Sequence, residues 1–226
     1  MGNKLKYLFL FFGMWFSLAV YAQRDLNMGV FLSGELDKRL NDNWNLSVSE
    51  ELRLMNAPVG FERSVTSAGV DYAFLHRKIK MGAYYSFLYL YNNNHYFEPR
   101  HRYYFNLSYR ESIGRYTLSW RGRVQGTYRD ENRGMYKINP KYVLRNKFQI
   151  DYSFWGRPWK PFLSCDLSNE LNNPMGNELT RIRYEAGTSW RLNRTDFMEF
   201  FVRFDQSLNA KDPFVLALGI GYKLKL

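Results

Sequence analysis

Apolar and polar residues alternate one for one along most of this chain. From residue 116 to 128 the even positions carry Tyr, Leu, Trp, Gly, Val, Gly and Tyr, while the odd positions carry Thr, Ser, Arg, Arg, Gln and Thr. Successive side chains of a strand point to opposite faces of a sheet, so a period of two residues is typical of β-structure. In residues 214–226 every even position is apolar. The pattern therefore predicts strands with one apolar and one polar face.

The same alternation predicts eleven strands and no helix beyond the N-terminal segment. The predicted strands are residues 26–36, 44–54, 64–74, 79–91, 101–109, 116–128, 141–154, 162–171, 181–192, 197–206 and 214–226. We place all seven prolines in the connections, because proline cannot donate a hydrogen bond to a β-ladder. Short connections such as 76–78 and 193–196 alternate with longer ones such as 92–99 and 129–140. One end of the molecule is thus expected to carry turns and the other loops.

Two architectures share this pattern: a soluble barrel or sandwich with the apolar face inside, and a membrane barrel with that face outside. Membrane strands need about 9–11 residues, whereas soluble strands average about 5–6. Most of the predicted strands reach the membrane length, and their apolar faces hold more large side chains than a small closed interior can take. The sequence therefore favours an all-β fold: a transmembrane antiparallel up-and-down β-barrel of 10 to 12 strands, with short periplasmic turns and longer extracellular loops.

The strand count raises a question of parity. Bacterial single-chain barrels have even strand numbers, which bring both chain ends to the periplasmic side. Eleven predicted segments therefore leave ten strands, if residues 26–36 are not part of the wall, or twelve, if one strand has been missed. We prefer twelve.

The N-terminus indicates export. Two lysines within residues 1–6 precede an uncharged run over residues 7–20, and Val20-Tyr21-Ala22 forms a small-x-small cleavage site. These are the parts of a secretory signal peptide. We expect residues 1–22 to be cleaved and residues 23–226 to form a single barrel domain in the cell outer membrane.

The amino-acid composition excludes several other classes of protein. A mean hydropathy of −0.47 does not accommodate several apolar helices, and 19% aromatic residues are too many for a disordered chain. The single cysteine, Cys165, rules out an internal disulfide and a thiolate metal cluster. The net charge of +11 does not point to nucleic acid as a partner, because the chain is predicted to be exported.

Several short motifs carry a family resemblance. They are Asn43-Trp44-Asn45-Leu46 leading to Glu51-Leu52-Arg53, then Pro99-Arg100-His101-Arg102, Leu144-Arg145-Asn146-Lys147, and Leu218-Gly219-Ile220-Gly221-Tyr222-Lys223. Together they resemble a family of uncharacterised outer-membrane β-barrels from Bacteroidota, known as a domain of unknown function. The resemblance implies a fold and a location but no site to transfer. The chain departs from many such barrels by ending in Leu226 rather than in an aromatic residue.

With the apolar faces toward lipid, the lumen receives more basic than acidic side chains. The basic ones include Arg53, Arg102, Arg110, Arg121, Arg123, Arg129, Lys141, Arg145, Lys147, Arg181, Arg183, Arg191 and Arg203. A basic lining favours a narrow, porin-like passive pore that prefers anionic solutes. The alternative is a plugged structural or surface-interaction barrel, in which arginines and carboxylates pair across strands. The candidate pore residues are Arg121, Arg123, Arg145, Lys147, Arg181 and Arg183.

Enzymatic chemistry finds little support in the sequence. A lipid hydrolase needs a serine and a histidine on one face at one height. The three histidines are His76 in a short turn, His95 in a loop and His101 on the lipid-side face, and no serine lies opposite His101. We predict no catalytic residue, no metal site and no cofactor. The expected partners are outer-membrane lipid, the barrel-assembly machinery during biogenesis and a small anionic solute.

Overall fold

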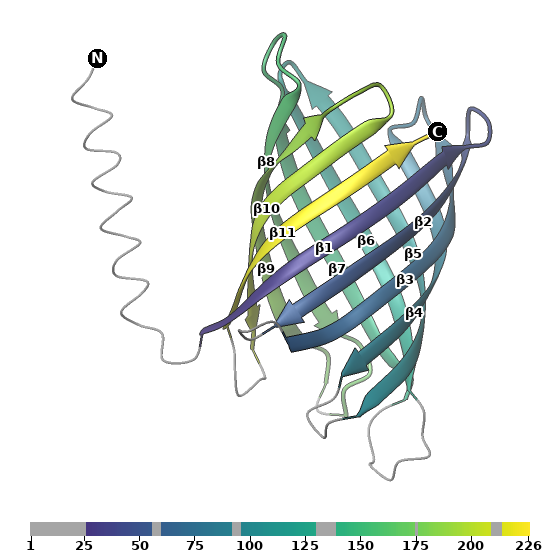
Figure 1. Ribbon diagram of the computed structural model, residues 1–226. Helices are drawn as coiled ribbons and strands as arrows, with labels where there is room; N and C mark the ends of the chain where they lie inside the picture. The colour runs from purple at the N-terminus through teal and green to yellow at the C-terminus, as the bar shows by residue number, and fades with distance from the viewer. Residues whose placement is uncertain (1–25, 56–59, 92–95, 130–138, 175, 209–213) are drawn as a thin grey trace.

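The chain forms a closed all-β barrel of eleven strands in the computed structural model (Figure 1), as the alternation predicts. The structure describes residues 26–55, 60–91, 96–129, 139–174, 176–208 and 214–226; the predicted signal peptide, residues 1–22, lies outside them. Within the described residues, no helix has the length and apolar character to cross a membrane. The strands are β1 (Leu26–Arg39), β2 (Trp44–Met55), β3 (Gly60–Phe74), β4 (Ile79–Tyr91), β5 (Phe97–Ile113), β6 (Tyr116–Arg129), β7 (Lys141–Tyr152), β8 (Trp159–Glu170), β9 (Glu178–Arg191), β10 (Asp196–Ser207) and β11 (Phe214–Lys225).

Two prolines contradict the prediction that strands exclude them. Pro99 and Pro161 each occupy the third position of a strand, in β5 and β8. Pro99 pairs with β4, but the β5–β6 ladder begins one residue later, at Arg100. Likewise Pro161 pairs with β9, whereas the β7–β8 ladder stops at Phe162. Each proline thus has a strand on one side only, and such a local edge position tolerates a residue without an N–H.

The barrel closes through a parallel pair. Strands β1 and β11 run in the same direction, in register from Leu26 opposite Phe214 to Asp37 opposite Lys225, while all other neighbours are antiparallel. The preference for an even, fully antiparallel barrel was therefore wrong, because a parallel closing pair removes both sheet edges with an odd number of strands. As a consequence, β1 begins at the end of the barrel opposite the short turns and the C-terminus (Figure 1).

The two faces of the wall differ as the pattern predicts. Outward-pointing side chains are apolar and exposed; Phe105, Leu163 and Leu218 retain more than half of their accessible surface. The inner face carries charged residues that are buried, including Asp166 and Arg183. The interior also holds buried apolar side chains, which two-residue periodicity does not predict: Phe31, Leu88, Tyr104 and Val143. The wall thus separates an apolar exterior from a largely polar interior.

Close packing at Gly187 makes a first prediction. A Cβ at Gly187 would clash with the carbonyl oxygen of Phe200 and lie 2.7 Å from the Cβ of Phe201. Because backbone cannot move aside as a side-chain tip can, Gly187→Ala is expected to cost about 1–3 kcal/mol in the free energy of unfolding. A Cβ at Gly34 would meet no atom within 4 Å, so Gly34→Ala is the matched control. Urea unfolding in detergent measures both, and equal midpoints would contradict the packing described.

Candidate functional site

All six candidate pore residues lie on strands whose inward faces line the interior. Arg121 lies opposite Lys147, and Arg123 opposite Arg145, across the β6–β7 pair. The structure brings these four, together with Arg183, to one interior cavity of about 360 Å³. Arg181 lies on the same strand as Arg183 but does not line that cavity.

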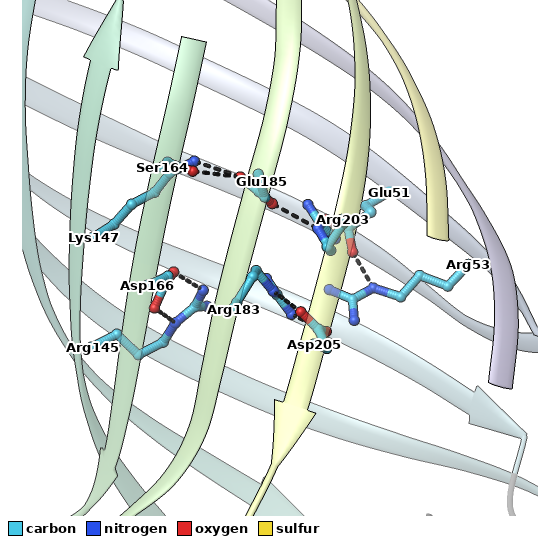
Figure 2. Close-up of polar contacts among 10 residues, drawn as sticks. All are labelled: Glu51, Arg53, Arg145, Lys147, Ser164, Asp166, Arg183, Glu185, Arg203 and Asp205. Carbon is cyan, nitrogen blue, oxygen red and sulfur yellow. Dashed lines mark hydrogen bonds and ion pairs between the residues drawn. The ribbon is translucent and has the colours of Figure 1, made fainter. Parts of the chain in front are cut away.

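One wall of the interior, formed by β7 to β10, carries a network of ion pairs (Figure 2). Arg145 binds Asp166 through its Nε and Nη2 atoms. Arg183 binds Asp205 in the same two-pronged way, with Nε···Oδ1 2.6 Å and Nη2···Oδ2 2.9 Å. This fork-to-carboxylate geometry gives strong, directional hydrogen bonds. Each of these arginines therefore uses its fork on a protein carboxylate.

Glu185, on β9, bonds to side chains from the three other strands of this wall. Its Oε2 accepts hydrogen bonds from Lys147 Nζ at 2.8 Å and Ser164 Oγ at 3.2 Å, and its Oε1 accepts one from Arg203 Nε at 2.6 Å. Figure 2 shows the resulting row of contacts running from β7 across β8 and β9 to β10. Because Lys147 and Arg203 share this one carboxylate, the charges of the wall form a network rather than separate pairs.

Phe31, on β1 at the closing seam, lies between Arg203 of the charged wall and Arg53 of β2. The guanidinium of Arg53 lies 4.5 Å and that of Arg203 lies 4.3 Å from the centre of the Phe31 ring. Arg53 also pairs with Glu51, whereas Arg203 Nη1 is buried and has no hydrogen-bond partner within the described chain. Stacking on an aromatic face holds a cation without neutralising it. No sequence signal identifies Phe31, because it lies at an inward position where a polar residue is expected.

A second group of arginines forms no ion pair within the described residues. Arg102, Arg121 and Arg123 line the same cavity, yet none forms an ion pair with a carboxylate of the described residues. The alternation places Arg102 in the lumen but does not show that it shares a cavity with Arg121 and Arg123. That grouping depends on register and strand tilt, which only the structure supplies.

A basic vestibule opens at the short-turn end. It is a cavity of about 590 Å³ whose lining includes Lys80, Arg110, Lys223 and Lys225. Arg121 and Lys147 line both this vestibule and the interior cavity. The two spaces therefore meet at these two cations.

The histidines do not assemble a catalytic group among the described residues. His76 lies in the turn between β3 and β4, and His95 lies outside the described residues. His101 is exposed and shares a hydrogen bond of 2.7 Å with the hydroxyl of Tyr85. No group of three or more metal-ligating side chains occurs in the described ranges.

Comparisons with known proteins give a family and a structural likeness. Over residues 12–212 the chain matches the family described as "Protein of unknown function (DUF2490)". No curated protein sequence matches the chain. Among solved structures, the β-domain of the Bordetella autotransporter BrkA is similar with a TM-score of 0.44 and 10% sequence identity, over 83% of this chain and 86% of that one.

Proposed function

The chain belongs to the DUF2490 family of proteins of unknown function, and we propose that it is an outer-membrane β-barrel whose interior is a narrow, passive route favouring small anions. Lipid would surround its apolar exterior, and the barrel-assembly machinery would insert it. The observation that carries the proposal is the set of cavity-lining arginines without carboxylate partners, Arg102, Arg121 and Arg123. Unneutralised cations in a confined channel favour anions over cations.

The arrangement of the cavities supports this route. The vestibule and the interior cavity share Arg121 and Lys147, so an anion entering at the short-turn end meets cations before it reaches the interior. Eleven strands also place the barrel between eight-stranded barrels, which side chains fill, and open channels of about 16 strands.

Ion selectivity in a planar bilayer tests the proposal. Under a gradient of potassium chloride, the purified protein is expected to give a reversal potential of the sign set by chloride preference. In the variant Arg121→Gln/Arg123→Gln that potential should move at least halfway toward zero, because two unneutralised charges leave the cavity.

The matched control removes two charges elsewhere. Arg115 and Arg157 are exposed on the turns, so Arg115→Gln/Arg157→Gln should retain most of the chloride preference. Absence of channel events from correctly folded protein would overturn the route. An unchanged reversal potential in the Arg121/Arg123 variant would overturn the role of these residues.

A plugged structural or surface-interaction barrel is the second candidate. It is favoured by Leu88, which is 1% exposed inside the barrel, and by the ion pairs that join the strands of the β7–β10 wall. Such a barrel would fold, shift on electrophoresis when heated and carry no current. The bilayer experiment therefore separates the two candidates.

A further inference from the structure

Two of the unneutralised arginines are held in place by neutral groups. Arg102 donates from Nε to Thr127 Oγ1 at 3.0 Å. Arg123 donates from Nε to Asn106 Oδ1 at 2.8 Å, and its guanidinium lies 4.0 Å from the centre of the Tyr104 ring. Because both anchors use Nε, the terminal Nη groups of both forks remain available. The anchors fix the position of each cation while leaving its charge intact.

The third member, Arg121, forms no hydrogen bond or ion pair with any side chain in the described part of the barrel. Its charge acts on Arg123, and the charge of Arg145 acts on Arg102, Arg121 and Arg123, while the carboxylates of Asp166 and Glu185 act on Arg121 without bonding to it. Arg145 lines the same cavity but differs from Arg121, because its guanidinium forms an ion pair with Asp166. Nine basic and six acidic side chains line this cavity, so positive charge is in excess there. An anion bound among the arginines would reduce the repulsion between them.

The cavity favours an anion with several oxygens. Guanidinium forks match the spacing of two oxygens on one phosphate or carboxylate, whereas a halide offers a single acceptor centre. Three forks present six donor groups, more than the roughly four lone-pair sites on the two oxygens of a monocarboxylate, whereas the four oxygens of a tetrahedral oxyanion offer enough acceptor sites. The cavity volume of about 360 Å³ lies in the range of small-molecule sites.

We propose that Arg102, Arg121 and Arg123 form a saturable binding site for a phosphate-class oxyanion, which enters from the vestibule at the short-turn end. Thr127, Asn106 and Tyr104 position the forks, and Arg121 meets the anion where the vestibule and the interior cavity join. The inference rests on the proposed function, since it names the solute class of the same lumen. It adds a binding equilibrium that is measurable without any current.

Calorimetric titration of the folded, full-length protein in detergent tests the site, with inorganic phosphate as the probe and sulfate, acetate and chloride as comparisons. Phosphate is expected to bind at one saturable site, and more tightly than acetate or chloride. Comparable binding of sulfate would define the class as tetrahedral oxyanions, and its failure to bind would narrow the class to phosphate. No saturable phosphate binding, or binding no tighter than that of acetate, would overturn the site.

The variants identify the residues. Arg123→Gln and Arg102→Gln should each lower the affinity for phosphate at least tenfold. Arg157→Gln, on an exposed turn, should leave that affinity unchanged. Arg123→Lys keeps the positive charge but lacks the guanidinium fork. It should therefore lower the affinity for phosphate while preserving the preference for chloride in bilayers. Retention of wild-type phosphate affinity by the two glutamine variants, shown to be folded by their shift on heating, would overturn the assignment.

The two proposals fail separately. A chloride-selective current with no phosphate site would remove this inference and leave the passive route. Phosphate binding without any current would remove the route and leave the site as a ligand-binding lumen.

Discussion

Asp205→Ala is expected to lower the free energy of unfolding of the barrel by about 3–5 kcal/mol. The Arg183 fork donates hydrogen bonds of 2.6 and 2.9 Å to this carboxylate, and both side chains are less than a tenth exposed. Alanine removes the carboxylate and leaves the guanidinium buried without its partner. An uncompensated buried charge costs more than the pair contributed, because the desolvation penalty remains. The urea-unfolding midpoint in detergent, followed by tryptophan fluorescence, measures the loss.

Two further variants distinguish the cost of a buried, unpaired cation from the cost of losing an ion pair. Arg183→Met/Asp205→Ala should recover most of the stability, because no buried cation is left unpaired. Lys78→Ala breaks an ion pair with Glu111 on the exposed turn end and should have little effect. If Asp205→Ala were as mild as Lys78→Ala, water would reach Arg183 freely. That result would also weaken the plugged-barrel candidate.

The alternation was sufficient to predict the wall of this barrel, because a membrane-type strand must present different residues to its two sides at every step. The strand predicted over residues 79–91 coincides with β4, and the other predicted strands differ from the observed ones by a few residues at their ends. The odd number of strands was not predictable in the same way. The parallel pairing of β1 with β11 joins the first and last strands, and no local pattern encodes that contact.

The candidate site was predicted as a set of inward positions but not as an arrangement. Arg121 and Arg145 are equivalent in the sequence pattern, yet only Arg145 forms an ion pair with Asp166. Which arginine meets a carboxylate depends on the offset between neighbouring strands, which the bulges between β2 and β3 and between β8 and β9 also alter. Leu88 was missed for a different reason: it lies in the apolar run Phe87-Leu88-Tyr89-Leu90-Tyr91, where alternation cannot identify the inner face.

Placement of the apolar face against lipid predicts that Phe148→Arg costs about 2–4 kcal/mol in the free energy of folding into a bilayer. Phe148 points outward from β7, opposite Trp120 on β6 and Cys165 on β8, and is 51% exposed. A guanidinium at this position must either enter the hydrocarbon or distort the bilayer around it. Urea unfolding of the protein in lipid vesicles measures the cost.

The adjacent residue provides the matched control. Gln149 points inward, lines the vestibule and donates a hydrogen bond of 2.9 Å from Nε2 to Asp151. Gln149→Arg introduces the same group one position along β7, where water and a carboxylate receive it, so its effect should be small. Because both variants introduce arginine, the difference between their free energies of unfolding reports only which face of the wall the residue occupies. Equal costs in vesicles, or stabilisation by Phe148→Arg, would mean that the outer face meets water and would remove the membrane from the proposed function.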